Sequence, residues 1–255
     1  MQTEQFKPDV IIIGAGLAGL TAAMEVTNAG KKVLLVDQET AENLGGRAYW
    51  SFGGLFLVNS SQQRRMGIKD SFELARQDWM GTAGFDREED YWPRQWAEAY
   101  LKFATEEKAA YVAKLGIKLM FMVGWAERGD GSASGHGNSV PRFHVSWGTG
   151  TGVVKPFVDK AFAAQEKGLL RFCFRHRVTK LLTQDGAVIG IAGDVLEDDN
   201  KARGVATNRN ILAAFEYYAD QVVIASGGIG ANHQLVRENW PERLGKAPVQ
   251  MISGV

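Results

Sequence analysis

Three glycines near the amino terminus follow a strongly apolar run with a regular spacing. Gly14, Gly16 and Gly19 form the pattern G-x-G-x-x-G directly after Val10–Ile13. The first glycine permits a tight turn, the second lets backbone N–H groups approach a pyrophosphate, and the third lets a helix pack closely on a strand. The amino end of that helix attracts anions through its unpaired N–H groups. We therefore predict a dinucleotide phosphate site, with Ala15 in its loop.

An acidic residue ends the next apolar run. Asp37 follows Val33–Val36 and lies 21 positions after Gly16. At this separation an acid binds the ribose hydroxyls of adenosine and disfavours a 2′-phosphate. The glycine pattern alone is weak evidence, because a glycine-rich turn without a ligand also satisfies it. Strand, helix, second strand and acid in this order favour the dinucleotide site over that alternative.

Two further glycine passages distinguish between dinucleotides. Gly45–Arg47 begins eight residues after Asp37 and continues into a glycine-bearing stretch at 48–54. In a nicotinamide enzyme the second strand usually leads into another crossover helix, so a glycine passage here favours FAD over NAD. Farther along, the apolar run Val222–Ala225 is followed by Ser226 and then by paired glycines. Such a run is typical of a buried parallel strand whose end closely approaches a ligand.

These segments together resemble the fumarate reductase/succinate dehydrogenase flavoprotein superfamily. Within it, Gly45–Ser51 and His136–His144 are similar to the bacterial FAD-binding dehydrogenases related to 3-ketosteroid dehydrogenases, and the resemblance extends over about residues 9–240. It implies FAD bound in an extended form across a Rossmann-like sheet, with the substrate stacked on the isoalloxazine under a capping domain. The cofactor-binding residues, from the motifs and from this resemblance, are Gly14, Ala15, Gly16, Gly19, Asp37, Gly45, Gly46, Arg47, Ser51, Gly53, Val178, Ala225, Ser226 and Gly227.

The expected fold class is α/β, a Rossmann-like FAD-binding domain of the glutathione-reductase type with a helical excursion and an inserted β-meander. Residues 1–255 would form it in four segments: 1–60 for the βαβ dinucleotide unit, 61–139 for the helical excursion and a mobile loop, 140–230 for a strand, glycine turn, helix, meander and Gly-Gly strand, and 231–255 for the start of a cap domain. Members of the superfamily continue into a cap and a glycine-bearing return segment. The resemblance therefore predicts an amino-terminal portion of a protein roughly twice as long, with the cap and the return segment absent and with little activity of its own.

Helical periodicity and capping residues predict the intervening helices. The first runs from Leu17 to Asn28, a second opens with a capping box at Asp70–Glu73, and a longer one continues to Gly116. Trp96, Tyr100 and other aromatic residues recur along the long helix at helical spacing, and Trp92 precedes them. Such stripes are usually core, so we expect them to be buried rather than to form a substrate-binding surface.

A polar strand and a glycine-rich turn follow. In Val140–Trp147, Arg142 and His144 alternate with apolar residues, which gives one apolar face and one face carrying a guanidinium and an imidazole. Gly148–Gly152 then leads into a helix with Pro156 in its first turn. This second helix start is expected to receive an anion.

A meander is expected in the second half of the chain. Asp185-Gly186 predicts a hairpin within 171–196. Residues 197–210 are interpreted as a charged surface excursion and Ile211–Tyr218 as a further strand, both with structural roles. The glycine- and serine-rich stretch Gly129–Asn138 is expected to be a mobile loop.

The predicted activity is that of an FAD-dependent oxidoreductase, through α,β-dehydrogenation or enone reduction of an organic substrate such as a ketosteroid. A hydride would pass between a substrate carbon and flavin N5 while a protein group moves a proton on the adjacent carbon. His144 is the best candidate for that proton transfer, together with Arg142, although a structural histidine is the more frequent case; His176 is expected to be exposed. Two alternatives remain open: a non-catalytic FAD-binding fragment and, disfavoured by the paired glycines, an NAD-dependent dehydrogenase.

Composition excludes several other classes. The 255 residues include 29 Lys and Arg against 29 Asp and Glu, so neither nucleic acid nor an anionic membrane surface is an expected partner. Cys173 is the single cysteine, which excludes an internal disulfide. No histidine pair has zinc-ligand spacing, and neither a nucleophile elbow nor a Walker motif is present. With no export signal and no apolar run of spanning length, we expect a cytoplasmic protein without a metal that acts on a small, hydrophobic molecule.

Overall fold

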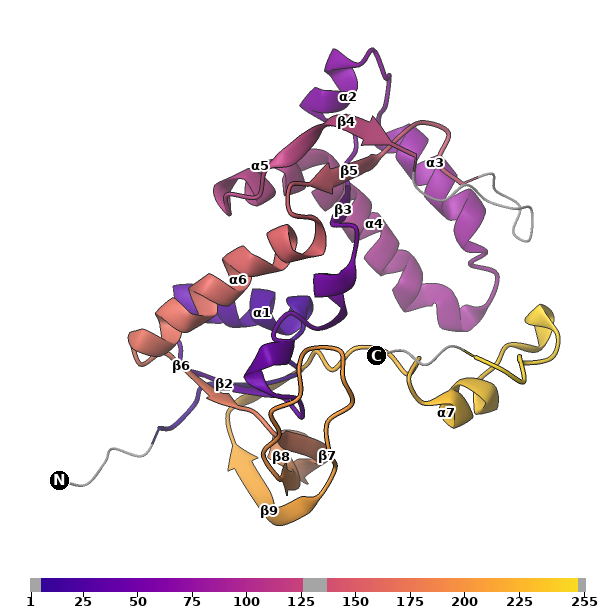
Figure 1. The fold of residues 1–255 in the computed structure, drawn as a ribbon. Coiled ribbons are helices and arrows are strands. Elements are labelled where there is room, and N and C mark those ends of the chain that lie inside the picture. Colours follow the sequence, from indigo (N-terminus) through magenta and orange to yellow (C-terminus); the bar gives the residue numbers. More distant parts are fainter. Residues whose placement is uncertain (1–5, 126–136, 252–255) are drawn as a thin grey trace. The chain divides into compact units, whose positions relative to one another are not determined.

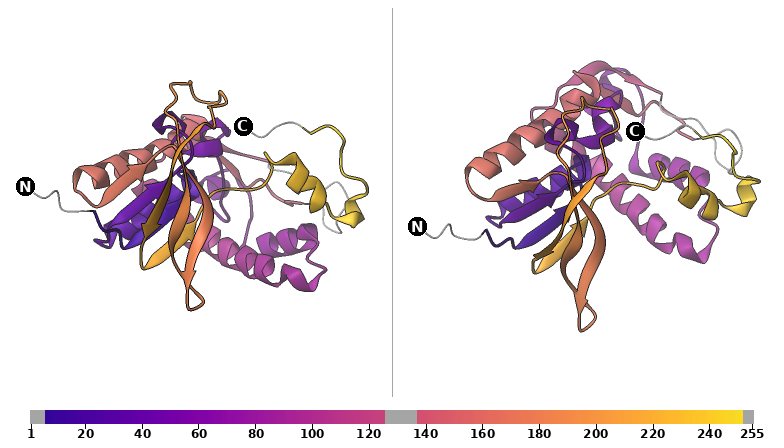
Figure 2. Two further views of the ribbon diagram at one scale, coloured as in Figure 1. Left: turned by 90° about the horizontal axis from the view of Figure 1, so that it is seen from below. Right: turned by 60° about the horizontal axis from the view of Figure 1, so that its bottom comes forward.

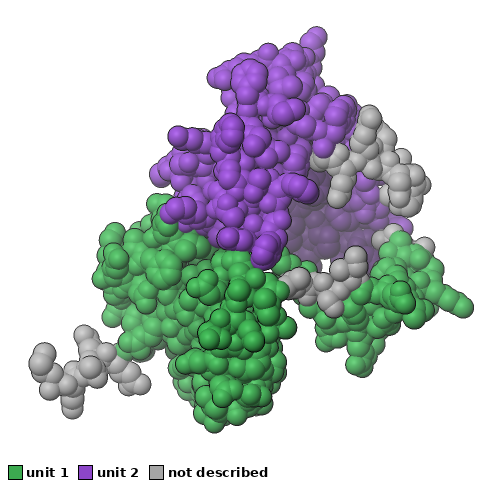
Figure 3. Space-filling view, in the orientation of Figure 1, with its two compact units in different colours: residues 1–47, 157–255 green, residues 48–156 purple. Residues whose placement is uncertain are grey.

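The computed structural model describes residues 6–125 and 137–251 (Figure 1). Its contacts divide the chain into two compact units, residues 1–47 with 157–255 and residues 48–156 (Figure 3). This division differs from the sequence-based segments, because the chain leaves the first unit just after the second glycine passage and returns to it within a helix.

The first unit is built on a parallel sheet with the order β10-β1-β2-β6. Its elements are β1 (Val10–Ile13), α1 (Leu17–Asn28), β2 (Val33–Val36), β6 (Leu170–Cys173) and β10 (Gln221–Ile224), with α1 connecting β1 to β2. All residues of β2 are buried, as expected in a parallel sheet covered on both faces. The predicted Rossmann-like α/β fold is confirmed, and α1 has the predicted bounds.

Three antiparallel strands form the β-meander of this unit. They are β7 (His176–Gln184), β8 (Ala187–Leu196) and β9 (Ile211–Tyr218). Asp185 and Gly186, between β7 and β8, have φ values of 50° and 80°, which suit the type I′ turn of a two-residue hairpin. The predicted hairpin and the predicted last strand of the meander are confirmed.

The start of the meander differs from the prediction. Residues 171–173 belong to β6 and pair with β2, because Arg175 adopts a φ of 59° and turns the chain into β7. The meander lies beside the sheet (Figure 2), and Phe215 shares a core cluster with Ile11. The ring of His176 lies 4.9 Å from that of Phe215 and is half-buried, so its expected exposure is wrong.

The second unit combines helices with a small antiparallel sheet of the order β3-β5-β4. Its elements are β3 (Gly54–Phe56), α2 (Ser61–Arg65), α3 (Phe72–Ala83), α4 (Tyr91–Glu106), α5 (Lys108–Lys114), β4 (Leu119–Gly124) and β5 (Phe143–Ser146). Helix α6 (Thr149–Glu166) begins in this unit and ends in the first, and α7 (His233–Glu238) follows β10. In the parts of the chain that the structure describes, no helix has both the length and the apolar character needed to cross a membrane.

Helix α3 begins one residue later than the predicted capping box requires. Ser71, not Asp70, is the N-cap, and its Oγ accepts a hydrogen bond of 3.1 Å from the N–H of Leu74. The carboxylate of Asp70 is bound by Arg142 instead. The capping prediction is therefore wrong by one position, because a distant ion pair takes the acid that the local pattern assigns to the helix.

The predicted long helix is two separate helices, α4 and α5. The buried face of α4 carries Ala97, Leu101 and Ala104, which recur at spacings of four and three. Trp92 and Trp96 are 68% and 74% exposed. The expectation that the aromatic stripe is core is thus wrong for both tryptophans, because the alanines and Leu101 provide the packed face.

Helix α6 also differs from its prediction. It begins at Thr149, so that Pro156 lies inside the helix rather than in its first turn. The glycines of the predicted turn thus form the first turn of the helix, and Gly150 lies too close to neighbouring backbone for any side chain. Most of the predicted mobile loop at 129–138 lies outside the described residues, as does His136.

Candidate functional site

The first glycine turn lies where three elements of the first unit meet. Gly14 has a φ of 101°, and its N–H donates to the carbonyl of Val36 at 2.7 Å. A Cβ at Gly14 would press on the carbonyl of Ala225, and a Cβ at Gly19 would overlap the carbonyl of Gly14. Glycine is therefore required at both positions, because the turn after β1 touches both the first turn of α1 and the end of β10.

The amino end of α1 is open. Gly16 is the N-cap residue, with an extended backbone and no side chain that caps the helix, and no acidic residue lies in the first turn. No atom lies within 4 Å of the position that a Cβ at Gly16 would occupy. The space beside the N-cap residue is therefore open, and the N–H groups and positive dipole end at this helix start provide the environment that an anionic group requires.

The second glycine passage contacts the first. The N–H of Gly45 donates to the carbonyl of Ala15 at 2.9 Å, and Gly45 forms a parallel bridge with Gly16. Gly45 and Gly46 have φ values of 92° and 55°, and a Cβ at Gly46 would lie 3.3 Å from the Cα of Gly16. We call the five residues Gly14, Gly16, Gly19, Gly45 and Gly46 the glycine site. Two passages that are far apart in the sequence thus expose backbone at one place.

The end of β10 contributes a third stretch of bare backbone. Ala225 donates its N–H to the carbonyl of Ile13 at 2.8 Å, which holds the segment Ser226–Gly228 beside the turn after β1. Gly227 has a φ of 81°, and no atom lies within 4 Å of a Cβ built at Gly227 or Gly228. This segment therefore has room for a ligand at the carboxyl edge of the sheet, where open α/β folds bind nucleotides.

Asp37 already has protein partners in this structure. Its Oδ2 accepts a hydrogen bond of 2.6 Å from the N–H of Ala15, and its Oδ1 accepts one of 2.8 Å from the N–H of Glu39. Burial raises the pKa of the Asp37 carboxyl, and these two N–H groups act in the opposite direction. Each oxygen keeps a second lone pair, so the carboxylate can hold the glycine turn and also accept a hydroxyl.

The remaining residues predicted to bind cofactor lie in different surroundings. Val178 pairs with Gly193 in the meander and packs against the core cluster of the first unit. Ser51 and Gly53 lie in the second unit, where the Oγ of Ser51 accepts the N–H of Gly53 at 3.1 Å. Arg47 is the last residue of the first unit. The cofactor roles of these residues stay predictions.

The start of α6 is closed by its own unit. The N–H of Gly150 donates to the carbonyl of Ser51 at 2.9 Å. A Cβ at Gly150 would overlap the carbonyls of Ala48 and Tyr49. The N–H of Gly150 is therefore not available to an anion, and this glycine instead permits close packing of the 48–51 backbone; anion binding by the rest of this helix start stays a prediction.

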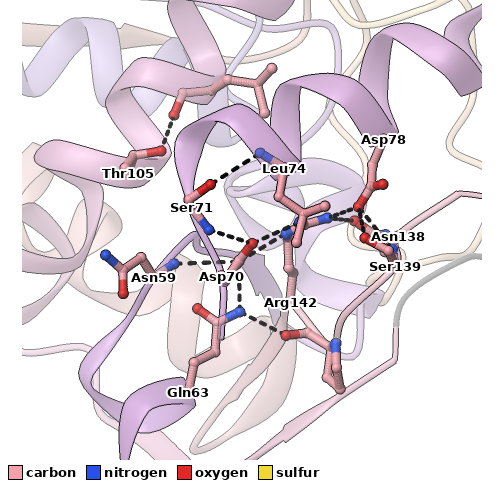
Figure 4. A network of polar contacts seen from close by, with 12 residues as sticks. Asn59, Gln63, Asp70, Ser71, Leu74, Asp78, Thr105, Asn138, Ser139 and Arg142 are labelled. Carbon is pink, nitrogen blue, oxygen red and sulfur yellow. Dashed lines mark hydrogen bonds and ion pairs between the residues drawn. The ribbon is translucent and has the colours of Figure 1, made fainter. Parts of the chain in front are cut away.

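The polar side chains of β5 and of Arg142, the residue directly before it, are buried. Arg142 has no exposed surface. Its Nε and Nη2 donate to the two carboxylate oxygens of Asp70 at 2.9 and 2.7 Å, and its Nη1 donates to Asp78 at 2.7 Å and to Asn138 at 2.9 Å (Figure 4). Burial opposes the charged form, but these two acids raise the pKa of Arg142. We call Arg142, Asp70 and Asp78 the arginine cluster.

His144 lies on the same face and is equally buried. Its Nδ1 is 2.9 Å from the carbonyl of Arg142, and its Nε2 is 2.7 Å from the Oγ of Ser60. Since a carbonyl only accepts, Nδ1 carries the hydrogen, and Nε2 accepts from Ser60, whose Oγ in turn accepts the N–H of Gln63. Burial lowers the pKa of His144, which keeps the imidazole neutral. Both candidate catalytic residues are thus bonded to protein partners and have no exposed surface.

Lys108 and Tyr100 form a polar pair that no motif in the sequence indicates. The Nζ of Lys108 donates to the hydroxyl of Tyr100 at 2.7 Å and lies 4.7 Å from the ring centre. Tyr100 packs against Trp79 and Phe56, with ring centres 5.5 and 5.9 Å away. Burial lowers the pKa of Lys108 to about 8 and raises that of Tyr100. Only a three-dimensional contact across the break between α4 and α5 reveals this pair.

Comparison with known proteins agrees with the geometry of the glycine site. The family model described as "FAD binding domain" matches residues 9–253. The chain belongs to this family. The cofactor of the family is FAD, and the open first turn of α1, together with the bare backbone at Gly45–Gly46 and Gly227–Gly228, leaves room for a pyrophosphate. The predicted FAD-binding fold and cofactor are confirmed.

The most similar relatives include steroid dehydrogenases. The KsdD-like steroid dehydrogenase of Mycolicibacterium smegmatis is 56% identical over 247 residues, which are 97% of this chain and 45% of that protein. The KsdD-like steroid dehydrogenase of Mycobacterium tuberculosis is 54% identical over 252 residues, or 99% of this chain and 44% of that protein. Urocanate reductase of Eggerthella lenta is 30% identical over 239 residues, or 92% and 34%. The chain spans less than half the length of these curated relatives.

Solved structures share the fold. The 3-ketosteroid-Δ4-(5α)-dehydrogenase of Rhodococcus jostii aligns with a TM-score of 0.70 at 23% identity, covering 96% of this chain and 51% of that chain. The open conformation of a flavocytochrome c3 fumarate reductase aligns with a TM-score of 0.67 at 22% identity, covering 94% and 37%. The predicted resemblance to the fumarate reductase and ketosteroid dehydrogenase flavoproteins is confirmed.

Proposed function

We propose that this chain forms the FAD-binding part of an oxidoreductase that acts on adjacent carbons of a small, hydrophobic molecule. When bound, FAD supplies a flavin ring that exchanges a hydride with a substrate carbon. The reaction class is α,β-dehydrogenation or the reverse reduction of an enone. The observation that carries this proposal is the uncapped, open first turn of α1, bordered by the second glycine passage.

The residues of the first unit bind and orient the cofactor. The first turn of α1 would hold the pyrophosphate through backbone N–H groups, since the glycine site has no side chain that blocks their approach. Asp37 would accept a ribose hydroxyl on a free lone pair while it holds Ala15. Backbone N–H groups rather than a basic patch would therefore bind the phosphates.

Arg142 and His144 are proposed to have structural roles. A proton donor must reach the proton acceptor within hydrogen-bond distance. Both side chains are completely buried, and their polar atoms bind Asp70, Asp78 and Ser60. They stabilise the attachment of β5 to α3 and α2, and we assign the proton transfer to neither residue.

The substrate class is supported by the relatives. Two relatives at 54% and 56% identity are named steroid dehydrogenases. We therefore propose a ketosteroid-like compound before a small dicarboxylate such as fumarate.

Gly16→Val tests the proposed cofactor site. The branched side chain would enter the open space above α1, so we expect the affinity for ADP, which represents the adenosine and pyrophosphate of FAD, to fall at least about tenfold. Ala29→Val, at the exposed opposite end of the same helix, is the control. Calorimetric titration measures both, and equal ADP affinity in wild type and Gly16→Val would contradict the proposal. Turnover of a 3-ketosteroid with a dye acceptor, by the oxidoreductase of which this chain is the FAD-binding part, then tests the reaction class. No turnover would contradict that class.

A further inference from the structure

A charged segment between β8 and β9, residues 197–210, folds back onto the end of β2. Glu39 accepts hydrogen bonds from the Nη2 of Arg209 at 2.6 Å and from the Oγ1 of Thr207 at 2.7 Å. The backbone N–H of Glu39 donates to the carboxylate of Asp37 at 2.8 Å. Glu39 therefore connects the 197–210 segment directly to the acid beside the glycine site.

Arg175 is buried, with 3% of its surface exposed, and it joins the 197–210 segment to the end of β2. A guanidinium has five N–H donors, and the structure provides acceptors for all five. These are the carbonyl of Glu197 at 3.0 Å, the carbonyl of Gln38 at 3.0 Å, the Oγ1 of Thr207 at 2.9 Å, and the carbonyl and Oδ1 of Asn208 at 2.8 and 3.3 Å. One planar group thus ties the residue after Asp37 to both ends of the segment.

The segment also reaches the second glycine passage. The Nη1 of Arg203 donates to the carbonyl of Leu44 at 3.1 Å, directly before Gly45. The carboxylate of Asp199 accepts the backbone N–H of Asn208 at 2.7 Å, which closes the segment on itself. The 197–210 segment therefore contacts both stretches of chain that border the glycine site.

We propose that the 197–210 segment belongs to the adenosine side of the cofactor site, with Arg175 and Arg209 as positioning residues for Asp37. This inference rests on the proposed FAD-binding function. Arg175 holds the turn after β2, and Arg209 holds Glu39, whose N–H fixes one oxygen of the Asp37 carboxylate. A carboxylate held in one orientation binds a ribose hydroxyl with less loss of conformational freedom.

Charges near Asp37 give this inference a distinctive signature. Burial raises the pKa of the Asp37 carboxyl, the backbone N–H groups that it accepts lower it, the Glu39 carboxylate raises it, and the Arg209 guanidinium lowers it. From the elements packed beside it, Cys173 and His176 contact the backbone N–H and carbonyl of Asp37. Because an ionised carboxylate is the stronger acceptor, nucleotide affinity should fall as the pH decreases through this pKa.

The test is the pH dependence of ADP affinity, measured by titration calorimetry on the full chain. Arg209→Gln removes a charge that lowers the pKa of Asp37, so the midpoint of the affinity loss should move to higher pH. Glu39→Gln removes a charge that raises this pKa, so the midpoint should move to lower pH. Arg177→Gln is the matched control. Arg177 pairs with Asp194 at 2.8 Å within the β7–β8 hairpin, so this substitution should leave the midpoint unchanged. An unchanged midpoint in Arg209→Gln would overturn the inference.

Arg175→Lys tests the second positioning residue. Lysine keeps the charge but has three donors in place of five and no planar fork, so we expect ADP affinity to fall about threefold or more. Equal ADP affinity in wild type and Arg175→Lys would remove Arg175 from the proposal. Gly16→Val separates the two levels of failure: retained ADP binding in that variant refutes the cofactor site itself. Loss of ADP binding in Gly16→Val, with no effect of Arg209→Gln, refutes only the positioning role.

Discussion

Arg142→Met should lower stability sharply, because it leaves Asp70 and Asp78 buried without their cation. Both ion pairs are 2.7 Å long, and the three side chains are between 0% and 3% exposed. Removing one partner of a buried pair costs about 3–5 kcal/mol. In a chain of this size each kcal/mol lowers the melting temperature by roughly 2–4 °C. The expected decrease is therefore about 6–20 °C.

Thermal unfolding followed by tryptophan fluorescence measures this decrease, with Arg76→Met as the control. Arg76 pairs with Glu98 at 2.6 Å in the same unit but is 52% exposed, so its loss should cost about 0–1 kcal/mol. A triple variant that combines Arg142→Met with Asp70→Asn and Asp78→Asn contains no buried charge in the arginine cluster and should recover part of the stability. Similar melting temperatures for Arg142→Met and Arg76→Met would refute the reasoning.

The same cluster predicts a pH dependence. Burial alone would raise the pKa of Asp78, but hydrogen bonds from Ser139 and Arg142 outweigh it and hold that pKa below its usual value. Because the pKa in the folded state is the lower one, this stabilisation is present at neutral pH and is lost as the pH falls through the lowered pKa. The melting temperature of the wild type should therefore decrease when the pH is lowered beyond about 4. This decrease should be smaller in Arg142→Met.

Two further predictions concern the glycine site and α5. Asp37→Ala should weaken ADP binding by about 1.5–3 kcal/mol in titration calorimetry, because it removes a charged acceptor; Asp9→Ala, at the far end of the sheet, should not, and equal losses would exclude a specific role for Asp37. The rate of Lys108 acylation should be half-maximal near pH 8, because burial lowers its pKa to about 8. Peptide mass mapping measures that rate, and a rate still rising steeply above about pH 9 would contradict the expected pKa.

The first unit could be predicted from the sequence because its signals are local. Gly19 contacts the backbone of the same turn, and the spacing of Gly14, Gly16 and Gly19 directly after an apolar run marks the start of α1; the contact of Gly14 with Ala225 is the one distant contact of this turn. The turn at Asp185–Gly186 needs two residues with positive φ, which its sequence provides. The hydrogen bond from the backbone N–H of Glu39 to the Asp37 carboxylate could not be predicted, because a backbone donor leaves no signal in the residue type.

The second unit was harder to predict because its helices carry two competing patterns. In α4 the aromatic residues and the small residues both recur at helical spacing, and hydrophobicity alone favours the wider aromatic face. The structure buries Ala97, Leu101 and Ala104, while Trp92 and Trp96 stay exposed. Side-chain volume decides this, since small residues allow the close approach that a packed helix needs.

The polar strand β5 shows why the candidate catalytic residues required the structure. Alternation along a strand separates its two faces but does not indicate which face is buried. Arg142 is buried because two acids, 72 and 64 positions earlier in the chain, neutralise its charge. No local sequence pattern predicts ion-pair partners at that separation. The local pattern at one of them, Asp70, predicts a helix cap instead. Arg175 is buried for the same reason in the first unit, because its five acceptors come from segments up to 137 positions away. In this chain a basic residue beside a strand is therefore an internal connection rather than a reactive group where its donors are already bonded to protein acceptors, as those of Arg142 and Arg175 are.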